Sequence, residues 1–353
     1  MGLKPCGSVK QSKSLSVPPS VGLNNFYVLD DETDPIEYEV EKVLDKRDDS
    51  KPNVDSFKIY SSPNDPLRKE TLYKMSKFEK LVNAADRGPF IRIVNNVDNQ
   101  GIQPYFTYIN ECFFGPGVPC PDPSFLTGCD CVNGCHNNPD CLCLHLNNHS
   151  FPYDENGILN PNHGGIYECN LFCKCGSDCL NRVVQNGRKV SLDIVRFSDG
   201  RGWGVVSAQD IKKGTYISTY TGEIITNEEA EQRAKIYDAN DRAYLFDLDF
   251  FLCQGAESEY TIDARQYGNI SHFFNHSCDP NIRVYACLIN HHDERLHHNT
   301  FFACKDIKRG QELCFDYTGL SRDASSNVVI KRPKEFSLPC LCGSSQCRKF
   351  VYR

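Results

Sequence analysis

Apolar residues follow two different spacings along the chain, one typical of a helix and one typical of short strands. The first spacing occupies a single short region: Leu72, Met75, Phe78, Leu81 and Val82. These positions recur every three or four residues, as on one face of an amphipathic helix, and Gly88-Pro89 supplies a stop soon afterwards. We therefore expect one helix over residues 68–88.

The second spacing begins at residue 189 and continues to 318 as short runs rich in β-branched and aromatic residues. The runs cover residues 190–197, 216–220, 244–251, 260–263, 284–289 and 313–317. Thr226 and Glu229 have the spacing of a capping box ahead of a helix over 230–237. Asp-Ile-Lys-Lys-Gly at 210–214 and Asp-Ile-Lys-Arg-Gly at 306–310 predict two equivalent turns. We expect a mainly β domain with short helices.

The remaining segments are polar or rich in cysteine. Residues 1–67 are polar with little periodicity and are expected to be flexible, and residues 319–337 have the composition of a linker. No apolar run approaches the roughly 18 residues of a membrane span, and no signal-peptide pattern opens the chain. We expect a soluble intracellular protein without a membrane partner. The net charge of −7 disfavours a general nucleic-acid binder and suits a basic partner.

Cysteines are concentrated in the region before the β domain. They form a first cluster of Cys129, Cys131, Cys135, Cys141 and Cys143 and a second of Cys169, Cys173, Cys175 and Cys179. Each cluster contains a Cys-x-Cys pair, which is too close to form an unstrained disulfide but suits metal coordination. Nine thiolates satisfy three four-coordinate zinc ions if three of them bridge. A secreted disulfide scaffold, the alternative, suits an odd number of cysteines poorly.

Two separated strings carry a resemblance to a known family. The first is Arg201-Gly202-Trp203-Gly204, and the second is Asn275-His276-Ser277-Cys278-Asp279-Pro280-Asn281 followed by Glu312-Leu313-Cys314-Phe315-Asp316-Tyr317. Together they resemble the SET domain of protein-lysine methyltransferases. The cysteine module before them and the Cys-x-Cys-x4-Cys tail after them resemble the pre-SET and post-SET modules of histone H3 lysine-9 methyltransferases. The resemblance covers residues from about 90 to the C-terminus.

The resemblance implies the small-sheet SET fold, with a pseudoknot near residues 275–278, and S-adenosylmethionine as the cofactor. Its predicted cofactor-binding residues are Arg201, Gly202, Trp203, Gly204, Tyr244, Asn275 and His276. Glycine allows the backbone to approach a ligand closely, and the aromatic faces suit a cationic sulfonium. The domains implied are a helix (68–88), a pre-SET module (89–182), a SET domain (189–318) and a post-SET tail (338–353).

The resemblance assigns catalysis to Tyr244, Tyr317 and Phe315. The two tyrosine hydroxyls are expected to orient the attacking lysine amine, which loses its proton more readily when desolvated beside a sulfonium. Phe315, together with Tyr260 and Tyr267, is expected to line a narrow apolar channel. A phenylalanine here leaves room for products beyond monomethyl-lysine.

Cys278 lies inside the cofactor motif and matches the family position that joins the tail cysteines. Cys278, Cys340, Cys342 and Cys347 would hold a fourth zinc ion in a closed tetrahedral site. The tail would then fold over the substrate channel, so that loss of this metal removes activity together with local order.

Two features depart from the family pattern. Many relatives have arginine at the position of His272, and loss of that fixed charge predicts slower turnover. Residues 37–45 resemble the opening strand of a chromodomain, a reader of methylated lysine, but the following residues lack the further strands and the aromatic cage. We expect no complete chromodomain.

The function implied is methyl transfer from S-adenosylmethionine to lysine 9 of the histone H3 tail, which supports heterochromatin and gene silencing. The expected partners are the H3 tail and chromatin proteins, without sequence-specific DNA contact, and the expected location is nuclear heterochromatin. Two alternatives remain: methylation of a non-histone protein, and a weakly active zinc-rich chromatin interaction protein. The sequence does not decide among them, because a target peptide would be recognised largely by strand pairing and surface pockets.

Overall fold

The computed structural model describes residues 65–102, 106–136, 138–237, 244–253, 256–318 and 338–352. This part contains three α-helices, namely α1 (Pro66–Ala85), α2 (Leu142–Leu146) and α3 (Asn227–Ile236). None of its helices is long and apolar enough to cross a membrane. The chromodomain-like stretch at 37–45 and the expected linker at 319–337 lie outside the described residues.

The strands of the described residues form small sheets, most of which join segments that are distant in sequence. One four-stranded sheet has the order β3 (Phe113–Phe114), β8 (Glu223–Thr226), β10 (Tyr260–Asp263), β9 (Leu245–Asp247). A second four-stranded sheet has the order β4 (Ile166–Tyr167), β13 (Ile282–Leu288), β14 (His298–Ala303), β7 (Tyr216–Thr219). A three-stranded sheet has the order β1 (Arg92–Val94), β5 (Leu192–Arg196), β6 (Trp203–Ser207). The pairs are β2 (Thr107–Tyr108) with β11 (Tyr267–Gly268), β12 (Asn275–His276) with β15 (Cys314–Phe315), and β16 (Leu338–Pro339) with β17 (Phe350–Tyr352). The prediction of a mainly β protein with short helices is confirmed.

Both longer helices begin at side-chain caps, of which only the one at Thr226 was predicted from the sequence; α1 begins two residues before and ends three residues before the expected bounds of 68–88. Asp65 accepts a hydrogen bond from the Leu67 amide at 3.0 Å at the start of α1, and Pro66 occupies the first turn. Thr226 accepts one from the Glu229 amide at 3.3 Å at the start of α3. The Glu229 carboxylate pairs with Arg233, so the contacts seen here are one half of a capping box.

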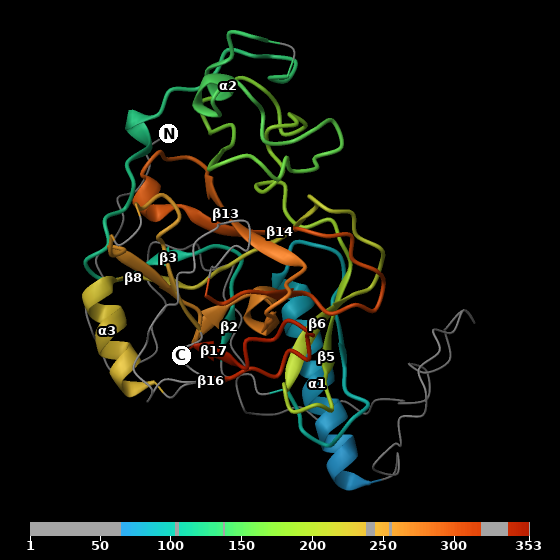
Figure 1. Ribbon diagram of the computed structural model, residues 1–353. Coiled ribbons are helices and arrows are strands. Elements are labelled where there is room, and N and C mark those ends of the chain that lie inside the picture. The colour runs from blue at the N-terminus through green and yellow to red at the C-terminus, as the bar shows by residue number, and fades with distance from the viewer. Residues whose placement is uncertain are drawn as a thin grey trace.

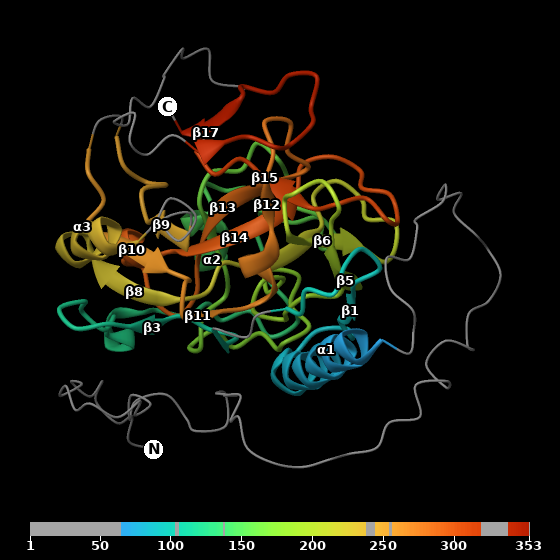
Figure 2. The ribbon, with the colours of Figure 1, turned by 90° about the horizontal axis from the view of Figure 1, so that it is seen from below.

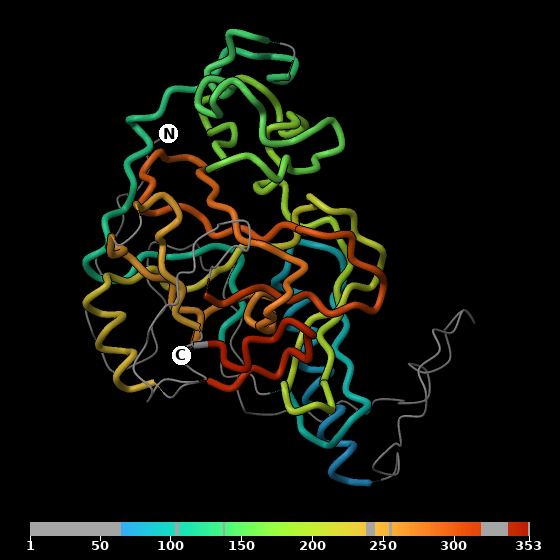
Figure 3. The backbone as a smooth tube through the Cα atoms, in the orientation of Figure 1, coloured from blue at the N-terminus to red at the C-terminus, as the bar shows by residue number. Residues whose placement is uncertain are grey.

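The cysteine-rich segment, residues 129–179, forms a lobe at one end of the molecule (Figures 1 and 3). Among its described residues, α2 is the only α-helix. Its buried cluster consists mainly of cysteines, not of aliphatic side chains. The lobe is fixed to the β domain by β4, which pairs in parallel with β13. Glu168, directly after β4, is buried and accepts hydrogen bonds from the Tyr153 hydroxyl at 2.9 Å and the Val184 amide at 2.6 Å.

The parallel pair β12 and β15 lies between the main sheets and the C-terminal hairpin (Figure 2). Asn275 is opposite Cys314, and His276 is opposite Phe315. Side-chain contacts reinforce the pair, since Asn281 donates to the Glu312 carbonyl at 2.7 Å and accepts from the Cys314 amide at 2.9 Å. The pair therefore brings together residues 275–281 and 312–317, the two parts of the second motif string.

The two similar turns pack against each other in a reciprocal arrangement. The Ile211 and Ile307 amides each donate to the other's carbonyl, at 2.7 and 2.8 Å. The Lys213 amide donates to Asp306 at 2.8 Å, and the Arg309 amide donates to Asp210 at 2.9 Å. The two similar sequences thus form equivalent turns that hydrogen-bond to each other. Together they connect the ends of β6 and β14 and the start of β7.

A buried ion pair connects the end of α1 with the segment that enters β5. The Arg188 guanidinium contacts Asp86 at 2.7 Å and donates to the Pro89 carbonyl at 2.7 Å. The Tyr108 hydroxyl donates to Asp86 at 2.5 Å and accepts from the Ile270 amide at 3.2 Å. Burial and the neighbouring Asp86 raise the pKa of Tyr108 well above its usual range. The network links α1 to the backbone just before the cofactor motif.

Arg188→Met is expected to lower the free energy of unfolding by about 3 kcal/mol, because it leaves the buried Asp86 carboxylate without its cation. The measurement is the midpoint of urea denaturation. Arg87→Met is the matched control, since the Arg87–Glu111 pair is exposed, and its effect should stay within about 0.5 kcal/mol. Equal effects of the two substitutions would contradict the prediction.

Candidate active site and zinc sites

The segment before β6 and the strand β12 meet at the face expected to hold the cofactor. A Cβ at Gly204 would lie 2.6 Å from Asn275 Nδ2 and 2.9 Å from Glu312 Oε1, so this position requires glycine. Gly202 has a φ of +84°, a conformation that also favours glycine. Asn275 Nδ2 donates to the Trp203 carbonyl at 3.2 Å and to Glu312 Oε1 at 2.8 Å. The structure thus brings Gly202, Trp203, Gly204 and Asn275 together.

Arg201 lies beside this face, and protein groups hold its guanidinium. It forms ion pairs with Asp199 at 2.6 Å and with Glu312. It also lies over the Phe197 ring, 4.6 Å from the centroid. Glu312 therefore connects Arg201 to Asn275. These contacts support a role for Arg201 in fixing the motif, and its direct contact with the cofactor stays a prediction.

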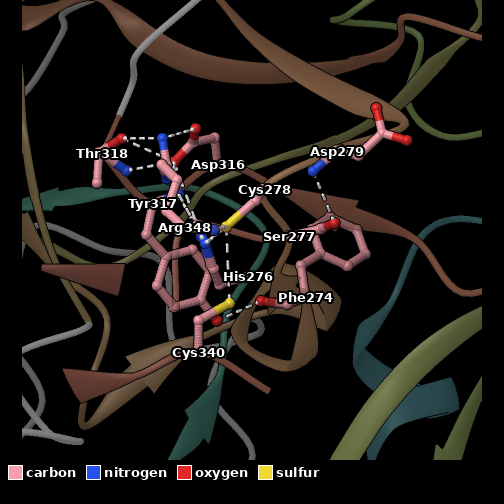
Figure 4. A network of polar contacts seen from close by, with 10 residues as sticks. All are labelled: Phe274, His276, Ser277, Cys278, Asp279, Asp316, Tyr317, Thr318, Cys340 and Arg348. Atoms are coloured by element: carbon pink, nitrogen blue, oxygen red, sulfur yellow. Dashed lines mark hydrogen bonds and ion pairs between the residues drawn. The ribbon is translucent and has the colours of Figure 1, made fainter. Parts of the chain in front are cut away.

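Tyr317 is fixed at both its hydroxyl and its backbone. The hydroxyl donates to the Phe274 carbonyl at 2.7 Å, and the Tyr317 amide donates to His276 Nδ1 at 3.2 Å (Figure 4). With its proton committed to a carbonyl, the hydroxyl oxygen is oriented as an acceptor. A donor such as a substrate amine is the chemical group that suits this oxygen.

Phe315 is buried directly beside Tyr317, at a ring-centroid distance of 4.7 Å. Its other neighbours are Phe301 at 4.9 Å and Phe246 at 5.9 Å. The wall next to Tyr317 is therefore phenylalanine on several sides and carries no hydroxyl of its own. Such a wall excludes water, and the space for an alkylated amine beside it stays a prediction.

Tyr244 stacks on His272, which in turn stacks on Phe106. The centroid distances are 4.2 and 4.3 Å, with interplanar angles of 8° and 16°. His272 Nδ1 also lies 3.0 Å from the Ala264 carbonyl. Burial lowers the pKa of His272 to about 4, so the imidazole is neutral at physiological pH. His272 thus acts as a neutral spacer that orients the Tyr244 ring.

For the methyl transfer that the resemblance implies, His272→Arg is expected to raise the rate severalfold, because it restores a fixed positive charge beside the site while a planar guanidinium can stack on Tyr244. Initial rates at saturating cofactor would test this. His149→Arg, at an exposed position in the cysteine lobe, is the control. An unchanged or lower rate for His272→Arg would count against the prediction.

The nine cysteines of the lobe converge with the spacing of thiolates around zinc. Eight of the sulfurs form three overlapping sets: Cys129, Cys131, Cys135 and Cys141; Cys129, Cys143, Cys169 and Cys173; Cys129, Cys135, Cys169 and Cys175. The ninth, Cys179, contacts the sulfur of Cys169. The Cys129–Cys135, Cys135–Cys169 and Cys169–Cys179 sulfur distances are 3.5, 3.4 and 3.9 Å. A tetrahedron with Zn–S bonds of about 2.3 Å has an edge of about 3.8 Å. The donor set therefore fits zinc.

Polar groups surround this cluster as they would surround excess negative charge. Arg182 donates to the Cys169 and Asn170 carbonyls, both at 3.0 Å, and its guanidinium lies 3.7 Å from Cys175 Sγ. Asn138 donates to Cys131 Sγ at 3.2 Å. Three zinc ions with nine thiolates would carry a net charge of about −3. These donors are oriented to stabilise it.

The C-terminal cysteines join Cys278, as the resemblance implied. Cys278, Cys340, Cys342 and Cys347 form a fourth set, with Cys278 and Cys340 sulfurs 3.7 Å apart. The set is a closed four-thiolate group of the kind that holds structural zinc. Because Cys278 follows His276 by two residues, this site lies directly against the cofactor motif (Figure 4).

Sequence reasoning missed several residues that the structure places at the site. The motif string contains Glu312 without giving it a role, and no sequence pattern predicts a role for Arg348 or Phe246. Glu312 and Arg348 are charged residues at the edges of motifs, and this position was the sequence signal that could have indicated a role. For Phe246 the sequence indicates only that it lies in a strand. Tyr267, expected at the channel, packs against Phe113 with a centroid distance of 4.8 Å.

Family comparisons agree with this architecture. The Pre-SET motif matches residues 84–182, and the SET domain matches residues 202–318. Histone-lysine N-methyltransferase SUV39H1-A of Danio rerio is 41% identical over 294 residues, covering 79% of this chain and 70% of the relative. Su(var)3-9 of Drosophila melanogaster is 41% identical over 293 residues, covering 81% of this chain and 45% of the relative. The H3 lysine-9 specific enzyme of Schizosaccharomyces pombe is 40% identical, covering 83% and 62%.

Solved structures show the same fold. The Neurospora SET domain protein DIM-5, a histone lysine methyltransferase, has a TM-score of 0.60 at 35% identity, covering 67% of this chain and 98% of that one. KRYPTONITE in complex with mCHH DNA, an H3(1-15) peptide and SAH has a TM-score of 0.64 at 32% identity, covering 78% and 53%.

The cysteine lobe and the paired motif strands therefore define a SET-domain protein with a Pre-SET module, and the predicted fold class is confirmed. More narrowly, the chain belongs to the Su(var)3-9 family of histone-lysine N-methyltransferases. It spans 45% of the Drosophila relative and 62% of the S. pombe relative.

Proposed function

We propose that this protein transfers methyl groups from S-adenosylmethionine to the side-chain amine of lysine 9 in the histone H3 tail. The observation that carries the proposal is the position of Tyr317, whose hydroxyl is oriented by the Phe274 carbonyl beside the phenylalanine wall. The family relationship and the SAH and H3 peptide in the KRYPTONITE complex support the cofactor and substrate.

The chain's own residues would bind, orient and desolvate. Gly202, Gly204, Asn275 and His276 would contact the cofactor, which supplies an electrophilic methyl group when bound. Tyr317 and Tyr244 would accept hydrogen bonds from the lysine amine and orient its lone pair. The apolar wall at Phe315 favours the neutral amine, because desolvation lowers a lysine pKa. No dedicated general base is required.

We further propose that the cysteine lobe holds three zinc ions. Cys129, Cys135 and Cys169 each belong to more than one four-sulfur set, which suits bridging ligands. The other six would bind singly, in the pairs Cys131 with Cys141, Cys143 with Cys173, and Cys175 with Cys179. The C-terminal set would hold a fourth zinc ion. Metal analysis of the purified chain should give about four zinc ions per molecule.

The location proposed is nuclear heterochromatin, with the H3 tail as a transient partner and other chromatin proteins as stable ones. It is supported by the chromatin enzymes among the relatives. The acidic net charge of −7 also suits a lysine-rich tail.

Incubation of the zinc-loaded chain with S-adenosylmethionine and an H3 tail peptide tests the function by mass spectrometry. The matched control peptide carries arginine at position 9. Each methyl group transferred adds about 14 Da to the peptide. Mass increases in steps of this size should appear only on the native peptide. Transfer to neither peptide, with the cofactor bound, would favour a non-histone substrate or the interaction-protein alternative.

Phe315→Tyr is expected to restrict the product to monomethyl-lysine, because the added hydroxyl fills space beside Tyr317. The wild type should add two or three methyl groups at saturating cofactor. The product distribution is read by mass spectrometry, with Phe250→Tyr, a partly exposed phenylalanine outside this wall, as the control. A wild type that stops at one methyl group would contradict the prediction.

A further inference from the structure

Arg348 joins the C-terminal cysteine site to the strand end that carries Tyr317. Its guanidinium grips the Asp316 carboxylate with two hydrogen bonds, from Nη1 to Oδ2 at 2.8 Å and from Nη2 to Oδ1 at 2.7 Å (Figure 4). Bidentate pairs of this kind combine strength with a fixed geometry. Asp316 lies between the wall residue Phe315 and the hydroxyl-bearing Tyr317. The Arg348–Asp316 pair therefore holds the backbone that carries both of these proposed site residues.

The other end of Arg348 is anchored at the cysteine site. It follows Cys347 directly, and its amide donates to Cys278 Sγ at 3.3 Å. Its Nη2 also lies 3.5 Å from His276 Nε2. One residue therefore contacts a thiolate of the C-terminal set, a residue of the predicted cofactor face and the acid next to Tyr317.

Asp316 is largely buried and connects Arg348 to the backbone that follows Tyr317. Its side chain is only 10% exposed, and Oδ1 also accepts from the Thr318 amide at 3.0 Å and the Thr318 hydroxyl at 2.7 Å. Arg348 Nη1 contacts the same hydroxyl at 3.4 Å. The backbone on the C-terminal side of Tyr317 is thus held by the Arg348–Asp316 pair, while His276 and Phe274 hold Tyr317 itself.

We propose that Arg348 is a positioning residue that couples metal binding at the C-terminal cysteines to the orientation of Tyr317. The inference rests on the proposed methyltransferase function. Metal at the four cysteines fixes the Arg348 backbone, which places the guanidinium on Asp316 and holds Tyr317 in register. Because coupling between two sites is reciprocal, weakening the pair at Asp316 should also weaken metal retention, although Asp316 is not a metal ligand.

The test uses the full chain and four variants: Arg348→Met, Arg348→Lys, Asp316→Asn and the Arg348→Met/Asp316→Asn double variant. Lys349→Met is the matched control, since it removes a positive charge at the exposed next position. At saturating zinc and well below the unfolding transition, Arg348→Met should retain full metal content, although loss of the cation beside the largely buried Asp316 carboxylate should lower the melting temperature. Its kcat should fall about tenfold or more, with a smaller change in the KM of the peptide, because misplacement of an orienting group affects chemistry more than binding.

The remaining variants separate positioning from a local structural role. Arg348→Lys keeps the charge without the bidentate geometry and should recover only part of kcat. The double variant should be about as slow as the slower single variant, since both break the same pair. The proposal is overturned if Arg348→Met turns over within twofold of Lys349→Met at full zinc content, or if the two single effects multiply.

Zinc release to a chelator gives a readout that does not depend on turnover. Asp316→Asn should release the C-terminal zinc severalfold faster than the wild type and leave the release of the other zinc ions unchanged. Release at the wild-type rate would overturn the coupling. If the wild type methylates no peptide, the proposed function fails, and the release rates alone still decide whether Arg348 couples the two sites.

Discussion

Tyr317→Phe is expected to lower kcat for methyl transfer by about two orders of magnitude and to leave the fold intact. The substitution removes the hydroxyl that the Phe274 carbonyl orients at 2.7 Å, while the ring keeps its contact with Phe315. Loss of an orienting group at the reacting atoms has an effect of this size. The measurement is single-turnover methylation of an H3 tail peptide.

Tyr285→Phe provides the control for this experiment. Its hydroxyl donates to the Pro161 carbonyl at 3.4 Å, at the junction with the cysteine lobe. It should change kcat less than twofold. If Tyr317→Phe retained more than a third of the wild-type rate while still binding S-adenosylmethionine, Tyr317 would have no orienting role.

Cys278→Ser should remove one zinc ion per chain and at least 99% of the activity, roughly a hundredfold loss. Serine is close in size to cysteine but binds zinc poorly, so the buried position stays filled while the C-terminal set loses a ligand. Without metal, the hairpin of β16 and β17 should become sensitive to protease. Native mass spectrometry, turnover and limited proteolysis follow the three changes.

Cys304→Ser is the appropriate comparison, because this half-buried thiol belongs to none of the four-sulfur sets found in the described residues. It should retain its zinc and its rate. A Cys278→Ser chain that kept either full zinc content or full turnover would contradict the role given to the C-terminal site.

Much of the site was predictable because its residues lie in short strings with unusual composition. Asn275 and His276 stand beside Cys278, and Phe315 stands two residues before Tyr317, so each string carried several site residues at once. Clustered cysteines were equally informative, since an odd number of thiols with Cys-x-Cys pairs in both clusters suits metal coordination better than disulfides. Thr226 predicted the start of α3, whereas α1 was expected only from residue 68 and begins at Pro66, after the Asp65 cap.

Contacts between distant segments could not be predicted in the same way. The pairing of His276 with Phe315 depends on register between two short strands, and strands of two residues leave no periodicity to read. The Arg348–Asp316 and Glu312–Asn275 contacts join charged or polar residues whose sequence neighbours give no sign of a partner. Which thiols bridge zinc depends on sulfur positions in space, which spacing along the chain does not determine.

Cys278 is translated before the three C-terminal cysteines with which it forms a four-sulfur set. Every residue of the predicted cofactor face has left the ribosome before Cys340, Cys342 and Cys347 are translated, and these are three of the four thiolates in the set. Since domains fold progressively from the N-terminal side, the sheets can form on a nascent chain that is still catalytically silent. Metal binding by the full set, and the proposed activity that depends on it, would then begin only after Cys347 has emerged.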